Sequence, residues 1–224
     1  MNKKLCVAGC SFSDYTEIDT VYGEILAEKL GYDYLHEAKG GGSNYRIWRR
    51  ITNHVMNGTL TPNDLLIIQY TGYERDEFWS SLFPYPYVGD FKDYEIYDTG
   101  ILTQFKVHSH TWQHHPIASE FHLLKENHFS SYEFDTERFN CQHLMFQTML
   151  LYKKIPTIFT RGIRISQLYE VLPEHEKMFF DDEKTNIFDV KYHLTPDDYA
   201  HMNQEGHYVY ADLLYDHITS LDIL

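Results

Sequence analysis

Two short segments at opposite ends of the chain carry side chains that could work together in acyl transfer. Near the N-terminus, Ser11 and Ser13 follow a short apolar run. Near the C-terminus, Asp198 and His201 stand three residues apart, just before a helical pattern. A serine hydroxyl, an imidazole that takes its proton and a carboxylate that orients the imidazole are the three parts of a Ser-His-Asp site. They can act together only if the fold brings the two ends of the chain into contact.

Each of these residues also has a simpler interpretation. Ser11 could be an ordinary turn residue, Asp198 an acid at a helix start and His201 a solvated loop residue. Asp197 competes with Asp198 as the orienting acid, although the Asp-x-x-His spacing favours Asp198. Cys10 could be a thiol nucleophile, but a cysteine that follows an apolar strand is usually buried and inert.

Apolar periodicity predicts the elements that must position these residues. Continuous apolar runs indicate buried strands, and apolar spacings of three and four indicate helices. The predicted strands cover residues 4–8, 32–36, 65–68, 155–160 and 188–190. The predicted helices cover residues 21–30, 43–58 with Ser43 as N-cap, about 138–153, 163–180 and 204–221. This alternation predicts an α/β fold with a parallel sheet and helices on both faces, where sites collect at the carboxyl ends of the strands.

Residues 74–137 interrupt the alternation. They are rich in aromatic residues and contain His108, His110, His114 and His115. Long stretches without regular structure are uncommon in compact domains, so we expect an insertion with short elements of its own within a single domain over residues 1–224. A wall or lid of a substrate cleft and a small satellite core are equally open interpretations. Because no partner ligand has clear spacing, we predict no metal site and no cofactor.

The motifs resemble those of the SGNH (GDSL-like) hydrolase superfamily. Members of that family have a three-layer α/β/α, flavodoxin-like fold and cleave or transfer acyl groups. Their first block reads Gly-Asp-Ser-x-Ser, and residues 9–13 read Gly-Cys-Ser-Phe-Ser. Their last block, Asp-x-x-His, matches Asp198 and His201, and the Asn, Gly and His that often follow are in register. The resemblance implies Ser11 as nucleophile, His201 as general base and Asp198 as the orienting acid, while His207 is expected to pack against or cap the last helix.

The resemblance also implies an oxyanion hole. The family's second block centres on a glycine whose amide helps to hold the oxyanion, and Gly41 is the better match, with Gly42 as the alternative. The third block supplies an asparagine, which is absent after the third predicted strand here. Asn44, Arg75 and Gln69 are candidates for the missing donor. Removal of one such donor costs about 10²–10³ in rate, so a weakened enzyme or a non-catalytic ligand-binding module is the alternative to an active esterase.

Composition narrows the possible partners. The formal net charge of −14 opposes nonspecific binding to nucleic acid or to anionic membranes. The three cysteines lack metal-ligand spacing and argue against a disulfide framework. No signal peptide and no apolar stretch of roughly 18 residues is visible, so we expect a soluble, cytoplasmic protein.

We predict a serine esterase that acts on a small acyl ester, such as an O-acetyl group on a carbohydrate. An acyltransferase would use the same covalent intermediate, and the sequence does not predict an oligomeric state.

Overall fold

The chain folds around a sheet of five parallel strands in the order β2-β1-β3-β6-β7. The computed structural model describes residues 2–15, 18–40, 42–71, 77–79, 96–98, 132–160, 178–180, 192 and 201–221. The strands are β1 (Lys4–Ala8), β2 (Asp33–His36), β3 (Leu65–Gln69), β6 (Thr157–Thr160) and β7 (Phe179–Phe180).

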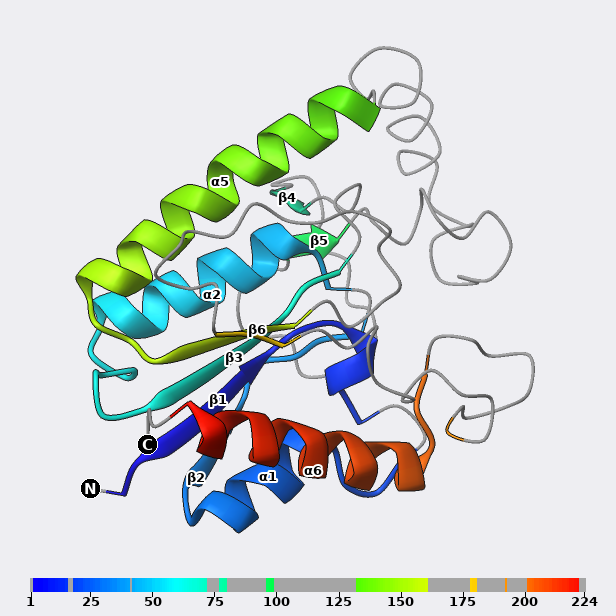
Figure 1. Ribbon diagram of the computed structural model, residues 1–224. Coiled ribbons are helices and arrows are strands. Elements are labelled where there is room, and N and C mark those ends of the chain that lie inside the picture. The colour runs from blue at the N-terminus through cyan, green and yellow to red at the C-terminus, as the bar shows by residue number, and fades with distance from the viewer. Residues whose placement is uncertain are drawn as a thin grey trace.

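Helices cover both faces of this sheet (Figure 1). One face carries α1 (Tyr22–Leu30) and α6 (Gln204–Ser220), and the other carries α2 (Asn44–Met56) and α5 (Tyr132–Tyr152). The predicted three-layer α/β/α architecture is therefore confirmed.

Alternate residues of the central strands divide the core into two halves. In β1, Leu5 and Val7 pack with residues of α1 and α6, whereas Cys6 and Ala8 pack with residues of α2 and α5. The residues of β3 alternate in the same way, and the whole strand is buried. Successive side chains of a strand point to opposite faces of the sheet. A continuous apolar run is therefore what a strand needs when helices cover both of its faces.

The ends of the first two helices follow from their sequences. Ser43 Oγ accepts a hydrogen bond from the N–H of Arg46 at 3.2 Å, which makes Ser43 the N-cap of α2. Gly31 ends α1 in the left-handed region at φ 68°, where a glycine carries no steric penalty. Both predicted helix ends are confirmed.

Two predicted elements need correction. The helix predicted from about residue 138 begins earlier, at Tyr132. The helix predicted over residues 163–180 is wrong at its end, because Phe179 and Phe180 form β7 beside Phe159 and Thr160 of β6. A strand of two residues has no periodicity to detect, and pairing along the edge of β6 orders it instead. The rest of that predicted helix, apart from Met178, and the strand predicted at 188–190 lie outside the described residues.

Short elements occur inside the predicted insertion. The strands β4 (Glu77–Trp79) and β5 (Ile96–Asp98) form an antiparallel pair. Most of the remaining insertion, including its four clustered histidines, lies outside the described residues. Among the residues that the structure describes, no helix is long and apolar enough to cross a membrane.

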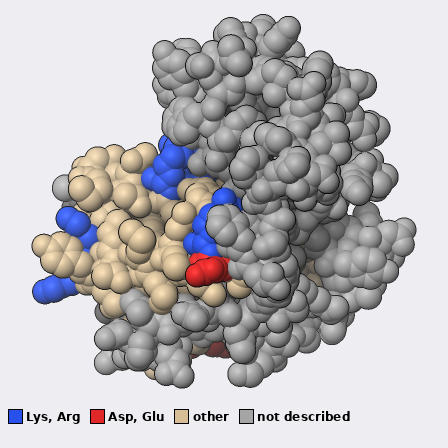
Figure 2. Space-filling view, turned by 90° about the horizontal axis from the view of Figure 1, so that it is seen from above, with Lys and Arg blue, Asp and Glu red and all other residues tan. Residues whose placement is uncertain are grey.

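A groove of about 460 Å³ runs between α2 and α5. Trp48, Met145 and Phe146 are among the residues that line it. Figure 2 views the molecule from the side of α5, and the described part of that face is mostly uncharged, with Lys and Arg side chains in a few places and acidic atoms near its centre. The groove includes neither Ser11 nor His201, so it is not the site that the motifs predict.

Candidate active site

Ser11 and His201 lie within hydrogen-bonding distance. Ser11 begins a short 3-10 turn, Ser11–Ser13, directly after β1, and His201 lies just before the N-cap of α6. Ser11 Oγ and His201 Nε2 are 2.8 Å apart, although the residues are 190 positions apart in sequence. Both side chains are partly exposed to solvent. In this geometry the hydroxyl of Ser11 can donate its proton to the imidazole, which is how a serine nucleophile is activated.

Gln204 ties the His201 segment to the loop that leads from Ser11 into α1. Its Oε1 accepts hydrogen bonds from the N–H groups of Asp19 and Thr20, each at 3.2 Å. Its Nε2 donates to the carbonyl of Thr20 at 2.8 Å. These three bonds join positions 184 or 185 residues apart. Gln204 therefore helps to hold the two halves of the site together.

His207 makes the next contact between the two ends of the chain. Its ring is buried, and its Nδ1 accepts the N–H of Tyr22 at 3.0 Å. The two rings stack with centroids 6.0 Å apart. Burial, and to a lesser extent the charge of His201, lowers the pKa of His207 to about 4. His207 is therefore neutral and packs α6 against α1, as the sequence led us to expect.

Ser13 anchors the turn that carries Ser11. Its Oγ donates to Oε1 of Gln69, at the end of β3, and lies 2.9 Å from the hydroxyl of Tyr22. Ser13 and Gln69 are fully buried. A Cβ on Gly9 would lie 2.5 Å from Ser13 Oγ and 3.1 Å from Gln69 Cβ, so only glycine leaves room for this anchor. Gln69 Nε2 has no hydrogen-bond partner in the described part of the chain, and its predicted role as oxyanion donor stays a prediction.

The glycine-rich loop after β2 lies against the end of β1. The N–H of Lys39 donates to the carbonyl of Gly9 at 3.1 Å, and the N–H of Gly42 donates to the carbonyl of Lys39 at 2.8 Å. A Cβ on Gly42 would lie 2.8 Å from the Lys39 oxygen and 3.3 Å from the Gly9 oxygen. The N–H of Gly42 is therefore used inside a turn. Gly41, the preferred oxyanion candidate, lies outside the described residues.

Asn44 joins the start of α2 to the end of β3. Its side chain is buried, Nδ2 donates to the carbonyl of Thr71 at 2.9 Å, and Oδ1 accepts the N–H of Thr71 at 3.0 Å. This pair of bonds gives Asn44 a structural role at the carboxyl edge of the sheet. Its predicted role in substrate binding stays a prediction, and the other two predicted site residues, Arg75 and Asp198, lie outside the described residues.

Cys10 is fully buried in the core shared with α1 and α6. The burial argues against the alternative in which this thiol, rather than the hydroxyl of Ser11, is the nucleophile, because a reactive thiolate needs an accessible site.

Sequence reasoning missed Asp14, His36 and Gln204. Asp14 Oδ1 lies 3.1 Å from His36 Nε2, and Asp14 Oδ2 accepts the N–H of Gly40 at 2.7 Å. No motif marks an aspartate after a turn or a histidine at a strand end. Gln204 lies three positions after the His of the Asp-x-x-His block, and its residue type did not suggest contacts to a loop far away in the sequence.

The fold has counterparts among solved structures, whereas neither the protein-family models nor the curated proteins gave a match to the sequence. The psychrotrophic esterase EstA from Pseudoalteromonas sp., in a structure inhibited by monoethylphosphonate, superposes with a TM-score of 0.53 at 11% identity over 98% of each chain. A GDSL-like lipase from Bacteroides thetaiotaomicron VPI-5482 superposes with a TM-score of 0.50 at 11% identity, covering 98% of this chain and 89% of the lipase. The chain therefore has the fold of the SGNH (GDSL-like) hydrolases, the superfamily that its motifs resemble.

Proposed function

We propose that this protein is a serine esterase that hydrolyses a small acyl ester. The observation that carries the proposal is the 2.8 Å separation of Ser11 Oγ and His201 Nε2. Ser11 Oγ attacks the ester carbonyl while His201 takes the hydroxyl proton, and the carbonyl oxygen becomes an oxyanion. As the oxyanion collapses, the ester C–O bond breaks and His201 returns the proton to the leaving alcohol. Water then hydrolyses the acyl-Ser11 ester with the same base.

Asp198 and two backbone amides complete the proposed site. Asp198 would orient His201 and stabilise its imidazolium, which is supported by the spacing of three residues between them. The amides of Ser11 and Gly41 would stabilise the oxyanion. The assignment of Gly41 is supported by its neighbour Gly42, whose own N–H donates to the carbonyl of Lys39.

The proposed substrate is an O-acetyl ester, with a carbohydrate as the alcohol. The aromatic residues of the insertion at 74–137 support the carbohydrate, because aromatic faces suit sugar rings. Acetylated sugars should then be cleaved with a higher kcat/KM than a simple acetate ester. An added sugar acceptor that becomes acetylated would identify an acyltransferase instead.

Hydrolysis of nitrophenyl acetate tests the proposed chemistry. We expect Ser11→Ala and His201→Ala to abolish turnover, whereas Ser220→Ala, a control on the exposed end of α6, should keep the wild-type rate. A fluorophosphonate probe should label the wild type at Ser11 and should not label His201→Ala. Equal rates of hydrolysis by the wild type and Ser11→Ala would reject the proposal that the protein is a serine esterase. The absence of labelling would favour the non-catalytic binding module.

A further inference from the structure

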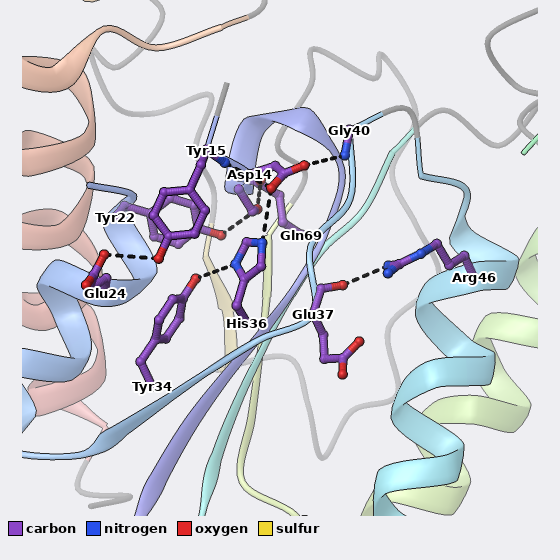
Figure 3. A network of polar contacts seen from close by, with 11 residues as sticks. Asp14, Tyr15, Tyr22, Glu24, Tyr34, His36, Glu37, Gly40, Arg46 and Gln69 are labelled. Carbon is purple, nitrogen blue, oxygen red and sulfur yellow. Dashed lines mark hydrogen bonds and ion pairs between the residues drawn. The ribbon is translucent and has the colours of Figure 1, made fainter. Parts of the chain in front are cut away.

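We propose that Asp14 is a positioning residue that fixes the spacing between the nucleophile loop and the glycine loop at 40–42. The inference rests on the proposed function, because these two loops would carry the oxyanion amides. Asp14 follows the Ser11–Ser13 turn directly and lies in Figure 3 between that turn and Gly40.

The carboxylate of Asp14 makes hydrogen bonds with groups from three segments of the chain. Its Oδ2 accepts the N–H of Gly40 at 2.7 Å. Its Oδ1 accepts the N–H of Tyr15 at 2.9 Å and lies 3.1 Å from Nε2 of His36 (Figure 3). One side chain therefore links the nucleophile loop, the end of β2 and the glycine loop. Gly40 immediately precedes Gly41 in the sequence, so the bond from Gly40 to Asp14 holds the residue next to the proposed oxyanion donor.

His36 holds the carboxylate in this position. Nδ1 of His36 lies 3.0 Å from the hydroxyl of Tyr34. When Tyr34 donates to Nδ1, the neutral ring carries its proton on Nε2 and donates it to Asp14. The ring of Tyr15 lies 5.0 Å from that of His36. In this tautomer both ring nitrogens of His36 have a partner.

The charge of Asp14 strengthens the bridge. Partial burial alone would raise the pKa of Asp14, but the hydrogen bonds from His36, Gly40 and Tyr15 outweigh burial and leave that pKa below its ordinary value. An ionised acceptor forms shorter and stronger hydrogen bonds than a neutral one. In the described part of the chain, the titratable groups around this carboxylate are His36, Tyr15 and Tyr34, with Glu24 behind the hydroxyl of Tyr15.

Removal of the carboxylate should therefore affect turnover more than substrate binding. In Asp14→Ala the N–H of Gly40 loses its acceptor, while Lys39 keeps its bond to Gly9. Misplacement of a reacting group by 1 Å can cost about 10² in rate, and loss of an oxyanion donor costs about 10²–10³. We expect Asp14→Ala to lower kcat by about 10- to 100-fold with KM changed by less than about threefold, because the loop is displaced and not deleted.

Asp64 offers a matched structural control. It precedes β3, at the end of the sheet opposite the site, and its carboxylate accepts from the N–H groups of Lys4 and Thr61, each at 2.8 Å. Asp64→Ala should lower Tm at least as much as Asp14→Ala and keep the wild-type kcat. Asp14→Asn keeps one oxygen that can accept the N–H of Gly40, so it should recover part of kcat. Equal losses of kcat in the two alanine variants, or an unchanged kcat in Asp14→Ala, would overturn the inference.

A second measurement works whether or not the protein turns over an ester. In amide NMR spectra, the Gly40 proton should shift as acid neutralises Asp14, and the shift should vanish in Asp14→Ala. If wild-type turnover did not depend on Ser11 while the Gly40 amide behaved in this way, the esterase proposal would fail and the bridge would stand. If the Gly40 amide responded neither to acid nor to Asp14→Ala, the proposed link between Asp14 and Gly40 would be rejected, even in an active esterase.

Discussion

The backbone N–H of Tyr22 donates to Nδ1 of His207, and this bond joins α1 to α6, beside the ion pair of Lys29 and Asp212. The bond requires an unprotonated Nδ1. Acid that protonates His207 therefore breaks one of the contacts that hold α6 against α1. The stability of the fold near Ser11 is thus linked to the protonation of a residue that does no chemistry.

We expect the stability of the protein to fall between about pH 6.5 and pH 4 because of His207. Its pKa is lowered from 6.5 to about 4, so the unfolded chain binds the proton more readily. The contribution is complete above pH 6.5, is lost as the pH falls towards 4, and is on the order of 3 kcal/mol at most. Urea unfolding at several pH values should show a flatter pH dependence for His207→Gln. An unchanged slope would show that other groups cause the acid sensitivity.

Gly9→Ala should destabilise the fold through Ser13. The new Cβ would lie 2.5 Å from Ser13 Oγ, and overpacking of this kind costs about 1–3 kcal/mol. Gly9→Ala combined with Ser13→Ala should cost less than the sum of the two single changes, because the second change removes the clashing hydroxyl. A double-mutant cycle in urea measures the coupling, and strict additivity would contradict the geometry.

Gln204→Ala should weaken both the fold and the proposed activity. The change removes three hydrogen bonds that hold the start of α6 near Thr20, and typical bonds contribute about 0.5–1.5 kcal/mol each. We expect a lower free energy of unfolding and a lower kcat, because His201 is then held less firmly opposite Ser11. Glu205→Ala, at the exposed neighbouring position, is the control and should leave both quantities near the wild-type values.

The role of Asn44 can be determined by comparing the effects of Asn44→Ala on stability and on turnover. Asn44→Ala leaves the backbone N–H and carbonyl of Thr71 without their side-chain partners, at a cost of about 1–3 kcal/mol for each group left unsatisfied. If Asn44 only joins α2 to β3, kcat of the folded variant should fall by less than about tenfold. A loss of about 10²–10³ in kcat would instead identify Asn44 as the missing oxyanion donor.

Local patterns predicted the parts of the fold that depend on local chemistry. A few neighbouring residues are enough to predict each of three features: the strand β3 from its apolar run, the start of α2 from Ser43 and the end of α1 from the glycine that follows it. The pairing of Ser11 with His201 was predictable because two motifs, each recognisable by itself, indicated one edge of a parallel sheet.

Side chains that bond backbone groups far away in the sequence could not be predicted in this way, because such contacts leave no pattern in the sequence. Asp14 accepts an N–H from 26 residues away, and Gln204 bonds a loop 184 residues away. Neither contact imposes a spacing on neighbouring side chains. The two residues of β7 were missed for a related reason, since an edge pairing with β6 orders them and their own sequence has no period.

The assembly of the site from both ends of the chain has a consequence for biosynthesis. Ser11 is synthesised 190 positions before His201, and the α6 contacts that hold His201 come later still. A nascent chain without α6 displays a hydroxyl with no imidazole beside it. Any reactivity at Ser11 that depends on His201 can therefore begin only after α6 has been synthesised and has packed against α1.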